Sequence, residues 1–162
     1  MKKVKNLLIC LLLAASPAVF AGQDQLGGLG IRLGEDISSV KVALHTDIDP
    51  EPIPRNPALP PNAPDFNRGR TLLHLRTKGV LVVFGQDGRS LVIRLDSPYS
   101  GSVMGIRLGD GADRIAAKLG KPIKKPWPAF MNMQAYRYVL DDSAYVTFDV
   151  SDNGVQYIFI SR

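Results

Sequence analysis

A six-residue segment that occurs twice constrains the fold of this chain more than any other feature. Residues 30–35 read GIRLGE, and residues 105–110 read GIRLGD. Five consecutive identities followed by an acid in both copies are improbable by chance in a chain of 162 residues, so they indicate an internal duplication. The sequence therefore predicts two related halves: a first repeat at residues 22–100 and a second at residues 101–162.

A short amphipathic helix is predicted after each copy of the segment. Apolar residues recur there with helical spacing: Ile37, Val40 and Leu44 in the first half, and Ala112, Ile115, Ala116 and Leu119 in the second. Asp110 and Asp113 suit the N-cap and the first turn of the second helix, and Gly120 followed by Pro122 predicts its end.

Each helix is followed by three predicted strands. These are residues 70–77, 80–84 and 90–95 in the first half, and residues 135–140, 144–150 and 155–160 in the second. Asp87-Gly88 and Asn153-Gly154 mark the last turn of each set. One half is too small to be stable alone, so the halves are expected to share one continuous sheet. The predicted fold class is α+β, a two-layer tandem repeat in which each half is a short helix plus a three-stranded antiparallel meander.

The first 21 residues have the pattern of a Sec-type signal peptide. Lysines precede an apolar run of nine residues, and small residues surround the expected cleavage site after Ala21. Cys10 lies within the apolar run rather than at the cleavage site, so lipidation is not expected. Residues 22–162 contain no cysteine, which excludes disulfides, a thiolate nucleophile and cysteine zinc sites there. The expected location is the periplasm.

The net charge must be read without this segment. The whole chain has a formal charge of +5, but three lysines belong to the signal peptide, which leaves 17 basic against 15 acidic residues. A charge of +2 gives no reason to expect binding to nucleic acid.

Neither catalysis nor a cofactor is predicted. Only His45 and His74 could act as histidine bases, His74 is interpreted as a solvent-facing strand residue, and no Gly-x-Ser-x-Gly nucleophile motif occurs. His45, Asp47 and Asp49 would share one face of an extended segment and could hold a divalent ion. A polar helix exit is the favoured interpretation of this cluster, so no metal site is predicted.

The GIRLGD segment, the short helix, the Leu-Gly-Lys-Pro stop at residues 119–122 and the Asn-Gly hairpin resemble one bacterial envelope module. This is the β-lactamase-inhibitor-protein-like fold, which the SmpA/OmlA assembly lipoproteins share. The resemblance covers residues 30–162 at the level of the fold, and it implies a non-enzymatic protein that binds other proteins through its sheet and loops. The chain departs from both families, because the inhibitor modules contain disulfides and the assembly proteins are lipidated single modules. No functional residue is carried over.

Two proline-rich loops are the candidate binding elements. The first, at residues 46–69, contains seven prolines and a single aromatic residue, Phe66. The second, at residues 121–134, combines cations with large apolar side chains, a composition typical of binding hot spots. The predicted partner-binding residues are Phe66, Lys124, Lys125, Trp127, Phe130, Met131 and Met133. Trp127 and Phe130 could equally fold back over the sheet, and the lysines could instead meet anionic lipid headgroups.

These observations predict an exported protein-binding module, an inhibitor or immunity protein that acts against an envelope enzyme or toxin. The alternative is an envelope assembly or structural factor. The expected partner is a protein of the envelope; contact with a membrane surface is the less favoured possibility.

Overall fold

Strands with alternating apolar residues, joined by tight turns, form most of this structure. It is a computed structural model that describes residues 28–162. The predicted signal peptide lies outside the described residues. The strands are β1 (Glu51–Pro52), β2 (Thr71–Leu75), β3 (Val80–Phe84), β4 (Ser90–Leu95), β5 (Trp127–Pro128), β6 (Gln134–Asp141), β7 (Ala144–Ser151) and β8 (Gly154–Ser161). The helices are α1 (Ile37–Ala43), α2 (Ala112–Leu119) and the 3₁₀ turns η2 (Arg76–Lys78) and η3 (Phe130–Asn132).

All eight strands form one antiparallel sheet with the order β1-β2-β3-β4-β8-β7-β6-β5. The meanders β2-β3-β4 and β6-β7-β8 meet where β4 pairs with β8, and Ile93 lies opposite Ile160 at this junction. Both isoleucines are fully buried. The expected continuous sheet and the α+β class are confirmed.

The sheet has eight strands rather than the six that the sequence predicts. The additional strands, β1 and β5, lie within the two loops that were expected to lack regular structure. Each has two residues and ends in a proline, Pro52 or Pro128. A proline is tolerated at the edge of a sheet, where its missing N–H removes no ladder hydrogen bond. The prolines of the two loops therefore do not rule out short edge strands within them. Similarly, the predicted strand 70–77 stops at Leu75, and η2 follows.

The two helices begin in different ways. Asp36 caps α1 by accepting hydrogen bonds from the Ser38 hydroxyl and the Ser39 amide, which lower the pKa of Asp36 to about 2. In α2 the N-cap is Gly111, so the prediction that Asp110 fills this position is wrong. The Asp110 carboxylate instead accepts the Arg107 amide at 2.8 Å and pairs with Arg114 at 3.1 Å.

The duplicated segments make the same backbone contacts in both halves. The Arg32 amide donates to Glu35, as the Arg107 amide donates to Asp110. Residues 34 and 35 then bond through their backbone to Ser90 at the start of β4, and residues 109 and 110 bond in the same pattern to Val155 at the start of β8. Each segment therefore attaches the helix that follows it to one strand of the central β4–β8 pair.

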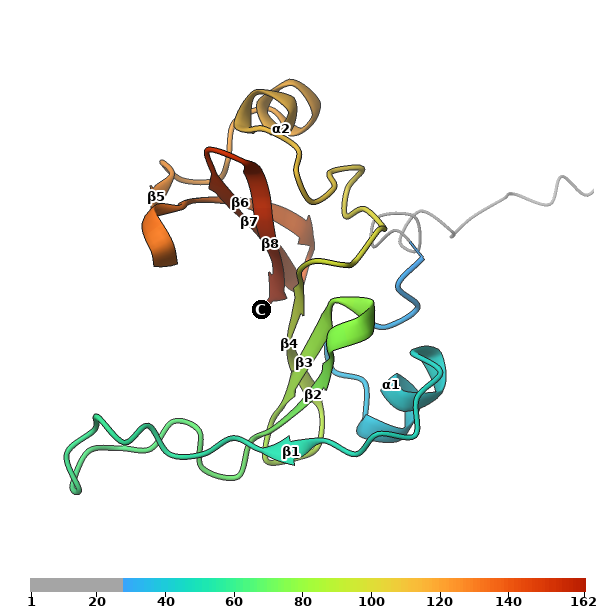
Figure 1. Ribbon diagram of the computed structural model, residues 1–162, viewed down its shortest axis with the longest axis vertical. Helices are drawn as coiled ribbons and strands as arrows, with labels where there is room; N and C mark the ends of the chain where they lie inside the picture. Colours follow the sequence, from blue (N-terminus) through green and yellow to red (C-terminus); the bar gives the residue numbers. More distant parts are fainter. Residues whose placement is uncertain (1–27) are drawn as a thin grey trace, which may run out of the picture.

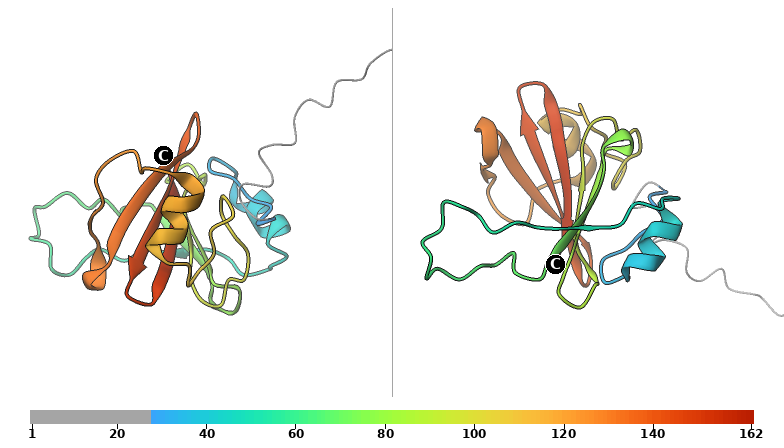
Figure 2. Two further views of the ribbon diagram at one scale, coloured as in Figure 1. Left: turned by 90° about the horizontal axis from the view of Figure 1, so that it is seen from above. Right: turned by 60° about the horizontal axis from the view of Figure 1, so that its bottom comes forward.

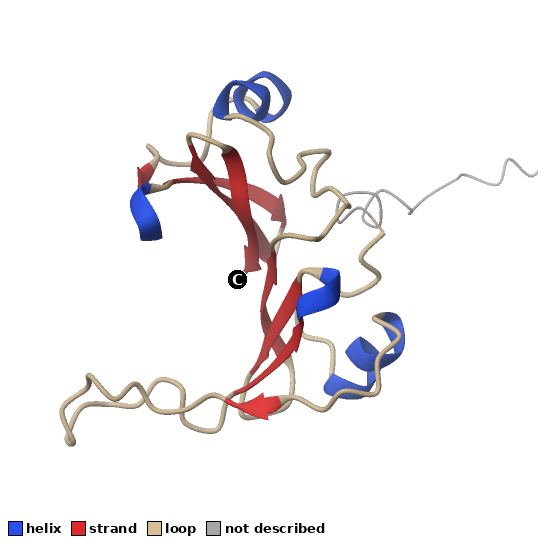
Figure 3. Ribbon diagram, in the orientation of Figure 1, coloured by secondary structure: helices blue, strands red, loops and turns tan. Residues whose placement is uncertain are grey.

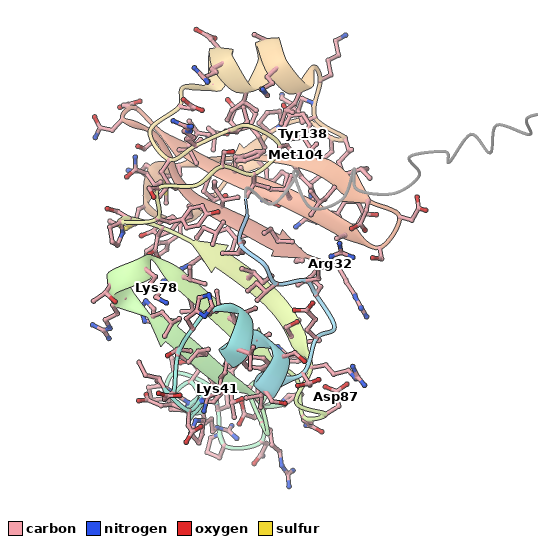
Figure 4. All side chains as sticks on the ribbon, turned by 90° about the vertical axis from the view of Figure 1, so that its right-hand side faces the viewer. Arg32, Lys41, Lys78, Asp87, Met104 and Tyr138 are labelled. Carbon is pink, nitrogen blue, oxygen red and sulfur yellow. The ribbon has the colours of Figure 1, made fainter. Side chains whose placement is uncertain are left out.

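The core lies between the sheet and the helices, which occupy the outer side of a curved sheet (Figures 1 and 2). Val40 of α1 and Ile115 of α2 are completely buried against strand residues such as Phe84 and Phe148. Lys78 of η2 donates to the carbonyl of Leu44 at the end of α1 and so ties that helix to the sheet; Figure 4 looks onto this helix-covered side.

Candidate functional site

The side of the sheet opposite the helices is the candidate functional surface. Figure 3 shows that α1 and α2 lie on one side of the strands, and no α helix of residues 28–162 covers the other side. In β3, the alternation that buries Val80, Val82 and Phe84 leaves Leu81 and Val83 facing away from the core. Strand register extends this face, here called the open face, to Leu72, His74, Leu81, Val83, Val92, Arg94, Ala135, Arg137, Val139, Tyr145, Thr147, Asp149, Tyr157, Phe159 and Ser161.

Aromatic residues and arginines occupy the middle of the open face. Phe159 of β8 lies opposite Arg94 on one neighbouring strand and opposite Thr147 on the other. The Tyr157 and Phe159 rings lie side by side, with their centroids 6.1 Å apart. Arg94 extends over the Tyr157 ring at 5.5 Å and forms an ion pair with Asp96 at 2.7 Å. Tyrosine and arginine are enriched in the energetic centres of protein interfaces.

A hollow of about 330 Å³ lies in the part of the open face that runs from β4 to β5 through β8, β7 and β6. Its lining includes Val92 and Phe159 from the central strands and Trp127 from β5. Lys124 approaches the Trp127 ring to 3.7 Å, and the Arg137 guanidinium lies 5.5 Å from the centre of the same ring. Arg137 also donates from Nε to the Thr147 hydroxyl at 3.0 Å. The rim of the hollow is therefore built from an aromatic ring with two cations against it.

Asp149 of β7 lines the same hollow and is 8% exposed. Burial raises the pKa of this carboxyl above its ordinary value. Its direct neighbours across the sheet are Ala135 and Tyr157, and the side chain of neither forms a hydrogen bond or an ion pair with the Asp149 carboxylate. A charged group in this position is unusual for an antiparallel strand and marks the hollow as more than an apolar patch.

A second hollow, of about 300 Å³, lies at the other end of the open face. Ile48 and Glu51 from the proline-rich loop line it, together with Leu72, His74 and Leu81 of the sheet. Burial, followed by the charges of Arg76 and Arg94, lowers the pKa of His74. His74 points away from the core, as the sequence interpretation expects, and it is partly buried on the open face.

The seven predicted partner-binding residues are not all at one site. Trp127 lines the hollow and Lys124 contacts its ring, whereas Phe130 and Met131 extend from η3 and are 79% and 69% exposed. Met133 is 3% exposed, so its inclusion in the predicted binding set is wrong. Met133 comes between η3 and β6, where the chain turns back into the sheet.

The remaining two predicted residues, Lys125 and Phe66, are both exposed. Phe66 is 74% exposed and belongs to the proline-rich loop, which projects on the same side of the sheet as η3 (Figure 1). The Arg55 guanidinium bonds the carbonyls of Pro60, Pro61 and Ala63 within this loop, so the projection has internal hydrogen bonds that hold its shape.

The His45 cluster lies elsewhere, on the helix side at the end of α1. His45, Asp47 and Asp49 line an open hollow there with Lys41, and Lys41 pairs with Asp49 at 2.6 Å. Within residues 28–162, no group of three His, Cys, Asp or Glu side chains is placed to hold a metal ion. No helix in the same range is long and apolar enough to cross a bilayer.

Comparison with known proteins gives one structural likeness. The chain matches no protein-family model and no curated protein sequence. The structure is similar to that of a DUF4309 family protein (YjgB) from Bacillus subtilis, with 18% identity, a TM-score of 0.48 and coverage of 85% of this chain and 84% of the other. A likeness at this level assigns neither a family nor a function.

The partner-binding residues predicted from the sequence all lie in the two loops, and the resemblance implied a role for the sheet without naming any of its residues. The alternation of β7 could have indicated a binding surface on the sheet, because Tyr145, Thr147 and Asp149 share a face that is neither apolar nor fully polar. The register that brings these residues beside Phe159 depends on pairing between β7 and β8, and spacing along one strand does not reveal it.

Proposed function

We propose that this protein is an exported protein-binding module that uses its open face to inhibit or neutralise an envelope-acting enzyme or toxin. The observation that carries the proposal is a sheet face without a helical cover on which Trp127, Tyr145, Tyr157, Arg94 and Arg137 gather. Exposed surfaces with apolar and aromatic residues, rimmed by charge, are typical of protein-interaction sites. In this proposal the protein binds its target and does not catalyse a reaction on it.

The proposal includes a two-layer tandem repeat of the β-lactamase-inhibitor-protein-like kind. The equal backbone contacts of residues 30–35 and 105–110, and the matching order of strands on either side of the β4–β8 pair, support a duplicated unit. Duplication gives each half one projecting element on the open side, the proline-rich loop and η3 (Figure 1). A partner seated between these elements would contact both halves.

The signal-peptide pattern of residues 1–21 supports export to the periplasm. Fractionation of cells that express the full chain tests this part of the proposal. We expect the protein in the periplasmic fraction, shortened by about two kilodaltons through removal of the apolar segment.

A capture experiment with matched variants tests the binding proposal. The tagged protein is incubated with an envelope extract, and the captured proteins are compared for wild type, Trp127→Ala and Tyr145→Ala on the open face, and Val42→Ala on α1. Val42 is 74% exposed on the helix side, so it controls for the loss of an exposed apolar side chain. We expect both open-face variants to lose a partner that Val42→Ala retains. Equal capture by all four proteins would contradict the use of this face.

Deletion of the gene then distinguishes neutralisation from assembly. New sensitivity to an enzyme or toxin of a neighbouring strain supports the inhibitor or immunity function. A defect in envelope permeability without such sensitivity would instead support the assembly factor that the sequence leaves as the alternative.

A further inference from the structure

Asp149 poses a chemical problem that the proposed function does not explain. Its carboxylate belongs to a residue that is 92% buried, yet none of residues 28–162 hydrogen-bonds to it or forms an ion pair with it. The carboxylate reaches solvent only in part, at the hollow that it lines, and the partial loss of hydration disfavours its charged form. A group that enters the hollow from outside the chain can therefore reach this carboxylate.

The space beside Asp149 is suited to receive a side chain. Ala135 lies directly opposite Asp149 and separates it from Trp127 in the same cross-strand row. The methyl group of Ala135 is small, so it leaves space between Trp127 and Asp149. The hollow of about 330 Å³ lies over Ala135. Trp127 and Phe159 line the hollow, so a group that enters it meets aromatic rings as well as the carboxylate.

The cations nearest to the hollow contact groups other than Asp149. Arg137 donates to Thr147 and lies against the Trp127 and Tyr145 rings, 5.5 and 5.7 Å from their centres. Lys124 contacts the Trp127 ring from the loop. Arg94 is paired with Asp96. Of the two charged residues that line the hollow, Arg137 and Asp149, these contacts leave only Asp149 without a partner among the described residues.

We propose that the hollow at Asp149 receives a lysine or arginine side chain of the protein partner. This inference rests on the proposed function, and it specifies the chemistry of the residue that the partner inserts. A carboxylate supplies a charge-assisted hydrogen bond to an ammonium or guanidinium group, and aromatic walls attract the same cation through their π faces. An acidic side chain would bring a second negative charge beside Asp149, an apolar side chain would leave the carboxylate unpaired, and a neutral donor would bond to it without compensating its charge.

Small analogues of the inserted side chain test the proposal without the partner. The protein obtained by expressing the full chain is titrated with n-butylammonium and n-propylguanidinium, followed by ¹H–¹⁵N NMR. The chain has a single tryptophan, so the Trp127 indole N–H gives one assignable signal at the hollow. We expect saturable shifts of this signal and of the Asp149 amide, with affinity weakened at least about fivefold in Asp149→Asn. Asp152→Asn, which removes an exposed acid from the β7–β8 turn, should bind like wild type.

Neutral and anionic analogues make the test independent of the variant. With wild-type protein, 1-butanol and butyrate should shift the same signals much less than n-butylammonium does. Equal shifts by these compounds, or unchanged binding in a folded Asp149→Asn variant, would overturn the proposal.

Partner capture separates this inference from the proposed function. If Trp127→Ala loses the partner and Asp149→Asn captures it as well as wild type does, the inserted-cation proposal fails while the binding function stands. If the cationic analogues bind at Asp149 but no open-face variant alters capture, the hollow is a cation site and the binding function fails.

Discussion

The ammonium group of Lys124 lies 3.7 Å from the centre of the Trp127 ring. This contact joins the proline-rich approach to β5 with the rim of the Asp149 hollow, and it fixes one wall of that hollow. Lys124→Met keeps most of the aliphatic stem and removes the charge, so we expect it to reduce stability by about 0.5–1 kcal/mol. Chemical unfolding followed by the fluorescence of the single tryptophan measures the loss.

Lys125→Met is the matched control for this change, because Lys125 is also exposed and has no ring contact among residues 28–162. Equal losses in the two variants would show that general charge, rather than the ring contact, is responsible.

The raised pKa of Asp149 predicts a particular dependence of stability on pH. The folded protein binds the proton more tightly than the unfolded chain, whose Asp has the ordinary pKa of 3.8. The free energy of unfolding should therefore fall as pH rises from about 4 through the raised pKa, and the penalty should persist at neutral pH. Asp149→Asn should be more stable than wild type at pH 7, on the order of 1 kcal/mol, with the difference shrinking toward pH 4.

Urea unfolding at several pH values measures this difference. The profile of Asp152→Asn should run parallel to that of wild type. A stability gain of Asp149→Asn that is constant with pH would rule out titration as its cause.

The junction of the two halves predicts coupled core substitutions. Ile93 and Ile160 face each other across the β4–β8 pair, so Ile93→Val and Ile160→Val should each cost about 0.5–1.5 kcal/mol. The double variant should deviate from the sum of the two, since the residues are in direct cross-strand register. A double-mutant cycle by chemical denaturation measures the coupling. Strict additivity together with two separate unfolding transitions would indicate that the halves fold independently.

A methyl group added at Gly154 is expected to be strongly destabilising. Its φ of +87° is left-handed, and a Cβ there would lie 2.3 Å from the carbonyl oxygen of Gly109. Gly109 has a similar φ of +83° but open space around its Cβ position. Gly109→Ala should therefore cost about 1–2 kcal/mol from backbone strain alone, whereas Gly154→Ala adds a clash with backbone and should cost more. Thermal unfolding compares the two, and a smaller loss for Gly154→Ala would contradict the close approach of residue 109 to β8.

The helices and the six long strands could be predicted because each depends on local spacing. The alternation around Ile93 and the Gly120 stop both lie within a few residues of the element that they define. The edge strands β1 and β5 could not be predicted, since a two-residue strand exists only through its partner. The N-cap at Gly111 was missed because Asp110 uses its carboxylate in the turn formed by residues 107–110.

The candidate site was predicted only where it touches a loop. Trp127 and Lys124 stand out in a proline-rich segment, whereas the hollow that Asp149 and Phe159 line forms only when five strands, β4 to β8, have paired. Burial of Met133 and exposure of Phe130, three residues apart, depend on the η3 turn, in which Met131 has a positive φ of 55°. Residue type alone therefore does not predict that Phe130 is exposed and Met133 is buried.

The position of β8 has a consequence for the order in which the protein can fold. Of the eight strands, β8 is made last, yet it lies at the centre of the sheet between β4 and β7. While the chain emerges from the ribosome, β4 and β7 each keep an unpaired edge, and only the arrival of residues 154–161 closes both. We expect nascent chains to remain susceptible to proteases until that strand is released, because the long-range pairing that completes the core cannot form earlier.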